Sequence, residues 1–450
     1  MQAVPTPITS KVKADTSRRV SVIGPVTDRG GRLLLLVPTT SYRIGDFLAA
    51  AHRRDIDVAV GSDQQSVLEQ FSQGRTLTVD FKALDHGIAQ ITAYHRDYPL
   101  GAIIGVDQET TLLAASASRS LGLPHNDPAA IEAVENKYRF RSRLANSGLP
   151  APWFTLLSFE EDLAGQATRL HFPVVLKPLA LSASRGVIRA NDPDQFMAAQ
   201  ARIKAILATT DQSGEGANHF LVESFIPGQE VALEGLLHQG RLQVLALFDK
   251  PDPLDGPYFE ETIYLTPSRL SAQVQKDIAE TVKTAVGTIG LSEGPIHAEL
   301  RINDQGAWLI EVAARSIGGL CGRTLQFGSG EQQEGLEDVI IRHALGLPQS
   351  LPDCMSGGVA EGAQAASGVM MIPIPSAGVL RHVDGLEDAR EMSGIDDITI
   401  SIPLGDVLVP VPEGNRYLGF IFSTGETPDQ VEAALRAAHD RLAFQIDAVG

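Results

Sequence analysis

Short apolar runs alternate with helical spacing over residues 32–126, and this alternation constrains the fold more than any other feature of the chain. The expected strands lie at 33–37, 56–60 and 102–106, and the expected helices lie at 44–53 and 109–121. Strands that alternate with helices imply a parallel sheet with helices on both faces. The first strand is followed by Pro-Thr-Thr-Ser rather than by a GxGxxG turn, so a dinucleotide-binding site is poorly supported.

A second unit begins near residue 130. Helical spacing covers 130–146 and is followed by short strands, a helix at 271–288 and a strand pair at 295–302 and 307–313. The short strands are expected at 174–177, 187–190, 220–225, 231–237 and 241–248. After residue 347 the chain is rich in Gly and Pro, and it ends in a helix predicted at 428–445 with Thr427 as its cap.

These patterns predict an α/β protein of several parts, because 450 residues are too many for one compact core. We expect a flexible tail at 1–30, an N-terminal parallel α/β domain at 31–128, a central domain at 129–346 and a small C-terminal α+β domain at 347–450.

The composition excludes some classes of partner and location. The chain has 37 basic and 55 acidic residues and a net charge of −18, which argues against nucleic acid or an anionic membrane as partner. Cys321 and Cys354 lie far apart and form no CxxC or Cys/His cluster, which argues against a disulfide scaffold or a structural zinc site. The longest early apolar run, 33–37, is too short to span a bilayer, and residues 1–30 contain no apolar segment of signal-peptide length. We therefore expect a cytoplasmic protein.

A strand pair in the central unit carries two glutamates that we expect to face each other. Strand alternation places His297, Glu299 and Arg301 on one face of the first strand. A three-residue loop centred on Gln305 and ending in a left-handed glycine would set Glu299 opposite Glu311. Directly opposed carboxylates repel each other, and a hard cation between them would compensate. The alternative is a solvated polar face balanced by Arg301 or His297.

An apolar strand that ends in Lys177 is followed by a loop of small residues at 178–186. Small residues let backbone N–H groups approach phosphate oxygens, and Lys177 would add a point charge. The GxxxxGK[ST] pattern of a P-loop is absent, and a surface hairpin with a terminal lysine is the alternative. Taken alone, Lys137 would be an ordinary lysine on a helix surface.

Taken together in chain order, these pieces resemble the ATP-grasp superfamily over roughly residues 130–320. The resemblance implies a two-part ATP-grasp domain with a mobile lid at about 150–225, ATP as cosubstrate and Mg²⁺ as metal, with Mn²⁺ as an alternative ion. It implies that Lys137 and Lys177 bind the nucleotide, that Glu299 and Glu311 bind magnesium, and that Glu223 and Glu230 hold the adenine and the ribose. The other nucleotide contacts it implies are Ser182, Ser184, Arg185 and Gly186 in the loop over the phosphates, and Ser224, Phe225 and Ile226 in the hinge.

A narrower resemblance, carried by residues 248–262 and 266–269, is to the ATP-grasp amino-acid ligases that make dipeptides and to carnosine-synthase-like ligases. It implies small carboxylic-acid and amine substrates, a homodimer, and contact between Lys250 and the terminal phosphate. One position departs from the family pattern: Ala313 stands where Asn commonly follows the second magnesium glutamate. Water could replace this oxygen ligand, because magnesium usually retains several waters.

The chemistry that this resemblance implies is formation of a C–N bond through an acyl phosphate. Lys177 and Lys250 would offset charge on the γ-phosphate, while Arg315 and His297 are candidates to stabilise the anionic tetrahedral state. Closure of the loop 178–186 would exclude water from the intermediate.

Two rival functions stay open at this point. A carboxylase or purine-pathway-type ligase of the same superfamily would activate bicarbonate or formate with the same fold and nucleotide site. A nucleotide-binding regulator that has lost catalysis would have Ala313 as its trace. The GxSxG pattern at 290–294 does not predict a hydrolase, because a helix precedes Ser292 and a strand follows it, the reverse of a nucleophile elbow.

Overall fold

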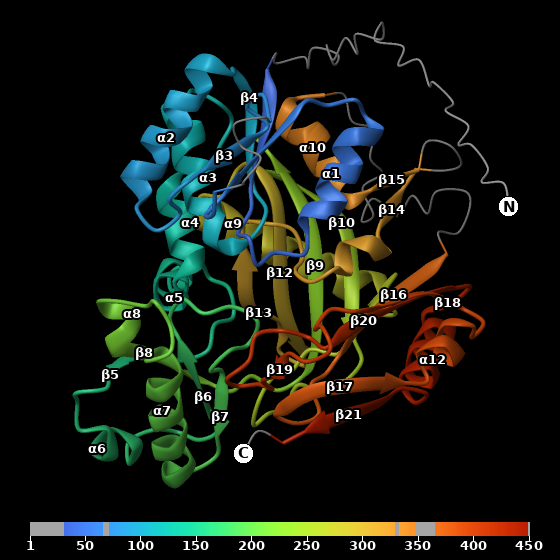
Figure 1. Ribbon diagram of the computed structural model, residues 1–450. Coiled ribbons are helices and arrows are strands. Elements are labelled where there is room, and N and C mark those ends of the chain that lie inside the picture. The colour runs from blue at the N-terminus through green and yellow to red at the C-terminus, as the bar shows by residue number, and fades with distance from the viewer. Residues whose placement is uncertain (1–30, 66–71, 329–332, 348–364, 449–450) are drawn as a thin grey trace, which may run out of the picture.

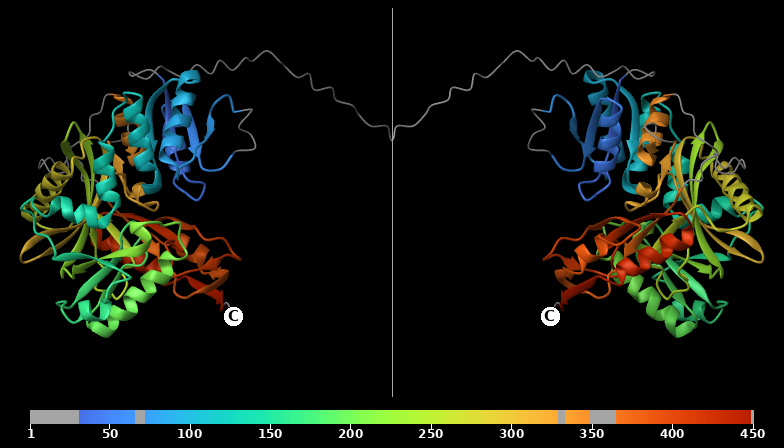
Figure 2. Two further views of the ribbon diagram at one scale, coloured as in Figure 1. Left: turned by 90° about the vertical axis from the view of Figure 1, so that its left-hand side faces the viewer. Right: turned by 90° about the vertical axis from the view of Figure 1, so that its right-hand side faces the viewer.

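The computed structural model describes residues 31–65, 72–328, 333–347 and 365–448, so the predicted tail at 1–30 and Cys354 lie outside the described residues. Figure 1 shows a central sheet with the N-terminal α/β unit at its upper end, a small sheet-and-helix unit at the lower left and the C-terminal segment at the lower right. The side views in Figure 2 show the same separation of the N-terminal unit from the other two. The predicted α/β class is confirmed.

The N-terminal unit is the predicted parallel sheet, with strand order β3-β2-β1-β4. Its strands are β1 (Arg32–Leu36), β2 (Val58–Ser62), β3 (Thr76–Thr78) and β4 (Leu100–Gly105), and its helices are α1 (Ile44–Arg53), α2 (Leu84–Asp97) and α3 (Gln108–Ser120). Leu33 and Leu35 pack in a cluster with residues of α1, whereas Leu34 and Leu36 pack with residues of α2 and α3. The run of buried leucines is continuous because helices cover both faces of the sheet.

The single helix predicted at 130–146 is wrong. The structure has two helices, α4 (Pro128–Glu135) and α5 (Lys137–Leu144), separated by Asn136 in an extended conformation. The side chain of Asn136 accepts hydrogen bonds from the N–H groups of Tyr138 and Arg139, as an N-terminal cap does. The break places Lys137 at the start of α5.

The unit at the lower left of Figure 1, called the lid below, has a four-stranded antiparallel sheet in the order β5-β8-β6-β7. Its elements are β5 (Phe154–Ser158), α6 (Leu163–Ala167), β6 (Val174–Pro178), β7 (Ile188–Ala190), α7 (Pro193–Leu207), α8 (Glu215–Asn218) and β8 (His219–Ser224). Helix α7 was not predicted. It covers the sheet through Phe196, Ala199 and Ile203, all of which are buried.

The central sheet has eight strands in the order β13-β12-β9-β10-β11-β16-β20-β18. Its strands are β9 (Gln229–His238), β10 (Arg241–Lys250), β11 (Ile263–Thr266), β12 (Gly294–Asn303), β13 (Gly306–Ala313), β16 (Ala366–Ile372), β18 (Ile395–Ile400) and β20 (Gly419–Gly425). Residues of α4, α5 and α9 (Ala272–Ile289) pack on one face. Residues of α10 (Leu336–Leu345) and of the N-terminal unit pack on the other. Ser292 lies in the turn between α9 and β12, as predicted.

The C-terminal segment adds three strands to the central sheet and forms a second, three-stranded sheet of β17 (Gly378–Asp384), β19 (Val407–Leu408) and β21 (Ala443–Asp447). Its helices are α11 (Leu386–Arg390) and α12 (Pro428–His439). The predicted helix at 428–445 is too long, because the chain turns after His439 and pairs with β17 as β21. The cap is confirmed, since the hydroxyl of Thr427 accepts from the N–H of Gln430.

The remaining elements are short: a 3₁₀ helix at Cys321–Thr324 and the strand pair β14 (Gln326–Phe327) and β15 (Glu334–Gly335). Among the residues that the structure describes, no helix combines the length and apolar character that crossing a membrane requires. We keep 31–128, 129–346 and 347–450 as the proposed parts of the chain, although the last two share one sheet.

Candidate active site

The strand pair β12–β13 places Glu299 opposite Glu311, as predicted, but the turn differs from the expected one. Asn303 pairs with Gly306, so the loop has two residues rather than three. A shift of register between Glu299 and Leu300 leaves Ile310 as an extra residue in β13. The bulge adds the residue that the shorter turn removes, and the two glutamates therefore still occupy directly opposed positions.

These carboxylates face a cavity of about 640 Å³ between the lid, the central sheet and the N-terminal unit. The predicted site residues that line it are Lys137, Lys177, Ser182, Ser184, Glu223, Ser224, Phe225, Ile226, Glu230, His297, Glu299, Glu311 and Arg315. Arg185, Gly186 and Lys250 are not among its described lining residues. The cavity thus brings together most of the predicted site residues, which come from widely separated parts of the chain.

Lysines 137 and 177 lie at the side of the cavity formed by the lid. Nζ of Lys137 donates to the carbonyl oxygen of Leu181 at 2.7 Å and lies 3.7 Å from a carboxylate oxygen of Glu311. Nζ of Lys177 lies 2.8 Å from a carboxylate oxygen of Glu223. Both ammonium groups are therefore positioned by existing contacts before any anionic substrate arrives.

Glu223 is also paired with Arg141, a residue that sequence reasoning missed. Nε of Arg141 donates to Glu223 at 2.6 Å, and its other nitrogens donate to the carbonyl oxygens of Leu309 and Ile310 at 2.7 and 3.0 Å. Burial alone would raise the pKa of Glu223, but the charges of Arg141 and Lys177 lower it to about 2. Arg141 therefore connects the lid strand β8 to the bulge beside Glu311.

A buried lysine compensates a cluster of three carboxylates. Nζ of Lys250 lies 2.6 Å from Glu230, 2.9 Å from Glu261 and 3.5 Å from Glu299. Although burial disfavours the ammonium form, these three charges raise the pKa of Lys250 well above its ordinary value. Contact between Lys250 and a terminal phosphate stays a prediction, because the ammonium group lies among carboxylates and its side chain is only 3% exposed.

His297 lies between two glutamates. Its Nδ1 is 3.2 Å from Glu234 and its Nε2 is 3.7 Å from Glu299. Burial lowers the pKa of His297, but the interactions with Glu234 and Glu299 outweigh it and raise the pKa to about 9. By contrast, the charge of Lys250 and the bond to His297 outweigh burial and lower the pKa of Glu299 to about 2. The imidazolium and the carboxylate are therefore both charged at neutral pH.

The loop over the cavity has an unusual backbone. Ala183 and Ser184 have φ values of 53° and 54°, in the left-handed region that non-glycine residues seldom adopt. Arg185 turns away from the cavity, and its Nε donates to the carbonyl oxygen of Glu413 at 2.8 Å. The N–H of Gly186 donates to the carbonyl oxygen of Pro412 at 2.8 Å. Nucleotide contacts by Arg185 and Gly186 stay predictions.

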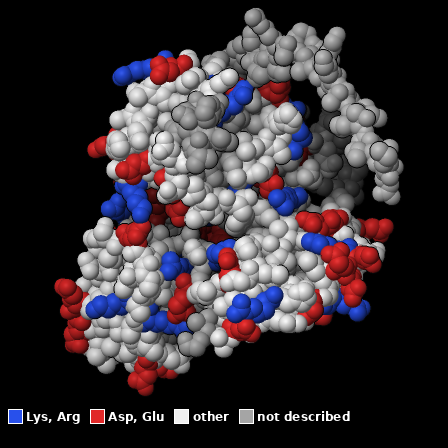
Figure 3. Space-filling model, in the orientation of Figure 1, with Lys and Arg blue, Asp and Glu red and all other residues white. Residues whose placement is uncertain are grey.

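Several residues that line the cavity were not among the predicted site residues. Arg43, from the N-terminal unit, donates to the carbonyl oxygen of Val106 at 2.7 Å and to the hydroxyl of Ser316 at 2.6 Å, next to Arg315. Glu261 lies in the segment that carried the narrower resemblance and could have been selected from it. Tyr264 and Tyr417 also line the cavity. On the face shown in Figure 3, Lys and Arg side chains lie in small groups among Asp and Glu.

Comparison with known proteins follows the same order along the chain. The model of the ATP-grasp N-terminal domain matches residues 48–125, and that of the ATP-grasp domain matches residues 170–324, which include Lys177, Glu223, Glu299 and Glu311. The chain belongs to the ATP-grasp superfamily. A third model, the L-amino acid ligase C-terminal domain 2, matches residues 370–447.

Individual ATP-grasp relatives agree with these matches. Dapdiamide A synthase of Enterobacter agglomerans is 27% identical over 372 residues, which cover 79% of this chain and 82% of that protein. Alanine–anticapsin ligase of Bacillus subtilis (strain 168) is 27% identical over 221 residues, which cover 45% of this chain and 46% of that protein. The crystal structure of an L-amino acid ligase from Bacillus licheniformis has the same fold, with a TM-score of 0.74 and 21% identity over 92% of this chain and 99% of that chain. On these matches the protein is an ATP-grasp ligase that forms C–N bonds.

The donor set of the ATP-grasp hairpin fits the magnesium ion that the superfamily implies. Two carboxylates on directly opposed positions repel each other, and carboxylate oxygens are ligands that magnesium prefers. Glu299 and Glu311 are the residues that would hold it. Ala313 pairs with His297 and supplies no side-chain donor.

Proposed function

We propose that this ligase joins the carboxylate of an amino acid, or of another small acid, to the amine of a second amino acid, through an acyl phosphate and with release of ADP and phosphate. The observation that carries the proposal is the opposed pair Glu299–Glu311, which shares one cavity with Lys137, Lys177 and Arg315. The names of the relatives supply the substrate class, because one is an L-amino acid ligase and another is an alanine–anticapsin ligase.

In the first step, an oxygen of the substrate carboxylate attacks the γ-phosphorus of ATP, and the bond to the ADP oxygen breaks. Such a transfer depends on positioning and on neutralisation of the phosphoryl charge. Lys137 and Lys177 supply two ammonium groups on the lid side of the cavity. A magnesium ion on Glu299 and Glu311 would neutralise further phosphate charge when bound.

In the second step, the neutral amine attacks the acyl carbon and the C–N bond forms. The bond from carbon to the phosphate oxygen breaks, and the departing phosphate takes up the proton that the nitrogen loses. Negative charge develops on the carbonyl oxygen, and preorganised cations stabilise it. Arg315 and His297 both line the cavity. His297 lies between Glu234 and Glu299, whose negative charges favour its protonated form, so it is suited to stabilise an anion rather than to remove the proton from the amine.

The test is release of ADP and phosphate from the purified protein with magnesium, ATP and a matrix of amino-acid pairs, with bicarbonate and formate as separate additions. Release that requires two amino acids, together with a product of dipeptide mass, is the expected result. Release with bicarbonate or formate alone would contradict the proposal and favour the carboxylase-like rival. Tight binding of ATP with no turnover across the matrix would favour the regulator.

An isotope experiment tests the acyl phosphate separately. With an acid labelled by ¹⁸O in its carboxylate, one labelled oxygen should pass to the released phosphate for each C–N bond formed. Labelled AMP together with pyrophosphate would instead show that the acid is activated as an adenylate. The Glu311→Gln variant, assayed in parallel, controls for a contaminating ATPase.

A further inference from the structure

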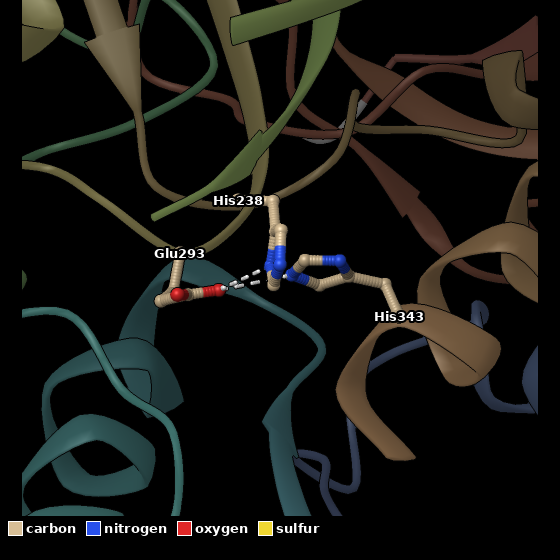
Figure 4. A group of neighbouring side chains, drawn as sticks. All are labelled: His238, Glu293 and His343. Atoms are coloured by element: carbon tan, nitrogen blue, oxygen red, sulfur yellow. Dashed lines mark ion pairs between the residues drawn. The ribbon is translucent and has the colours of Figure 1, made fainter. Parts of the chain in front are cut away.

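A second group of potential metal ligands lies away from the cavity, where the end of β9, the turn before β12 and the last turn of α10 meet. Figure 4 shows His238, Glu293 and His343 pointing toward one another from these three segments. Glu230, at the start of β9, belongs to the active site, and His238 is the last residue of the same strand. Eight residues of extended strand separate them by about 26 Å, so the two sites are distinct.

The distances in this group match those between the ligands of a tetrahedral metal ion. Nδ1 of His238 lies 3.5 Å from one carboxylate oxygen of Glu293, and Nε2 of His343 lies 3.3 Å from the same oxygen. Bonds of about 2.0–2.2 Å at tetrahedral angles separate neighbouring ligand atoms by about 3.3–3.5 Å. All three atoms lie within 4.8 Å of one another, so binding requires only a small approach of the two imidazoles.

The backbone around Glu293 orients its side chain toward the two histidines. The N–H of Gln239 donates to the other carboxylate oxygen of Glu293 at 3.1 Å, which leaves the first oxygen for the imidazoles. The side chain of Asn126 accepts from the N–H of Glu293 at 2.9 Å and donates to its carbonyl oxygen at 2.7 Å. Such supporting contacts are typical of the residues around metal ligands.

His343 faces two groups with opposite requirements. The N–H of Gly294 points at its Nε2 from 3.2 Å, which calls for a lone pair on that nitrogen, while the Glu293 oxygen at 3.3 Å calls for a proton there. One nitrogen cannot satisfy both neighbours at once. A cation between Nε2 and the carboxylate would take the lone pair in place of the Gly294 N–H and would compensate the negative charge of Glu293.

We propose that His238, Glu293 and His343 form a site for a divalent transition-metal ion of the zinc class. Two imidazole nitrogens and one carboxylate oxygen suit zinc and its neighbours, whereas magnesium prefers oxygen ligands alone. The ion can enter from solvent, because the side chain of His238 is 58% exposed. A cavity of about 500 Å³ lined by both histidines leaves room for water as a fourth ligand. The ion would tie α10 to the ends of β9 and β12.

The test is a titration of the full chain, without a histidine tag and after treatment with a chelator, using Zn²⁺ in the presence of excess Mg²⁺ and ADP. Zinc that binds at the carboxylate pair would bind the parent and the histidine variants alike, so the difference between parent and variant measures the histidine site. The variants are His238→Ala and His343→Gln, and the matched control is His382→Ala, which removes a comparably exposed histidine that also lies beside a carboxylate. Thermal unfolding of each metal-free variant verifies that it folds.

We expect one equivalent of Zn²⁺ to bind the parent and the His382→Ala control, and each site variant to bind it at least tenfold more weakly. Co²⁺ should give the parent the intense visible absorption of four-coordinate cobalt, and His238→Ala should lose it. If the folded His238→Ala variant takes up zinc as tightly as the parent, or if the parent takes up none, the proposal is wrong.

Discussion

Replacing Glu223 with Gln tests the buried ion pairs that connect the lid to the β12–β13 hairpin. Its carboxylate lies between Arg141 and Lys177, at 2.6 and 2.8 Å. Gln keeps the shape of the side chain but removes the charge, so both cations lose their shared counter-charge. Because Arg141 also holds the carbonyl oxygens of the β13 bulge, the loss affects the segment next to Glu311 as well.

The pKa of Glu223 gives the size of the effect. Its lowering from 4.5 to about 2 corresponds to about 3 kcal/mol at neutral pH. Removing one partner of a buried ion pair independently suggests a loss of about 3–5 kcal/mol. We therefore expect Glu223→Gln to lower the free energy of unfolding by about 3 kcal/mol at pH 7.

The stabilisation by Glu223 depends on pH, and the lowered pKa determines the direction of this dependence. Because the folded-state pKa lies below the unfolded one, the stabilisation by Glu223 is fully present above pH 4.5 and is lost as the pH falls toward 2. The difference between parent and variant should begin to shrink near pH 4.5 and should be smaller by about 1 kcal/mol at pH 3.5.

Urea unfolding between pH 8 and pH 3.5, followed by tryptophan fluorescence, measures the difference. The two tryptophans report on the lid and on the central sheet, because Trp153 lies beside the lid hinge and Trp308 lies in β13. The matched control is Glu160→Gln, an exposed glutamate of the lid, which should leave the unfolding midpoint unchanged. Equal stability of Glu223→Gln and parent at pH 7, or a difference that does not vary with pH, would refute the reasoning.

Three further changes test other charges of the site. Lys250→Met leaves three carboxylates without their shared cation, so we expect the free energy of unfolding to fall by about 3–5 kcal/mol and magnesium to restore part of this loss. Thermal unfolding with and without Mg²⁺ measures both effects, and an unchanged melting temperature would contradict the prediction. Glu311→Gln should reduce ligation more than about 100-fold, measured as product formed at saturating Mg²⁺, and retained turnover would exclude the metal assignment. Glu413→Gln removes the ion pair with Arg202, at 2.5 and 2.8 Å, and because both side chains are 40% exposed the stability should change by less than about 1 kcal/mol. If this ion pair holds the lid closed, Glu413→Gln should release more phosphate per molecule of ligation product than the parent does. An unchanged ratio of phosphate to product would show that the pair does not hold the lid closed.

Local periodicity predicted most of the strands but not all of the helices. The buried leucines of β1 and the alternation in β12 were sufficient, because each pattern repeats within a few residues. Helix α7 was missed although Asp192-Pro193 is a start signal of the same kind as Thr427-Pro428, and the side chain of Asp192 indeed accepts from the N–H of Gln195. The excess length of the last predicted helix came from extending its spacing through 440–445, where the chain turns and enters β21.

The Glu299–Glu311 pair was predicted correctly from a wrong turn. The sequence suggested a three-residue loop, and nothing local to residues 303–306 indicates the bulge at Ile310 that compensates the shorter loop. The carbonyl oxygen of Ile310 is held by Arg141, which lies 169 residues away along the chain. A register that depends on such a distant contact cannot be read from the strand pair alone.

Contacts between charged residues of the site are also made by residues far apart in the chain, so local sequence does not predict them. Lys250 is an example. The resemblance predicts contact with a phosphate, but the fold surrounds the ammonium group with carboxylates from β9, β12 and the segment before β11. Of these contacts, the one to Glu299 is the longest, at 3.5 Å. A cation that binds Glu299 would therefore compete for the weakest of the three interactions, and the ammonium group would keep its pairs with Glu230 and Glu261. The position of Lys250 thus favours a role in which it preserves the charge balance beside Glu299, the proposed metal ligand.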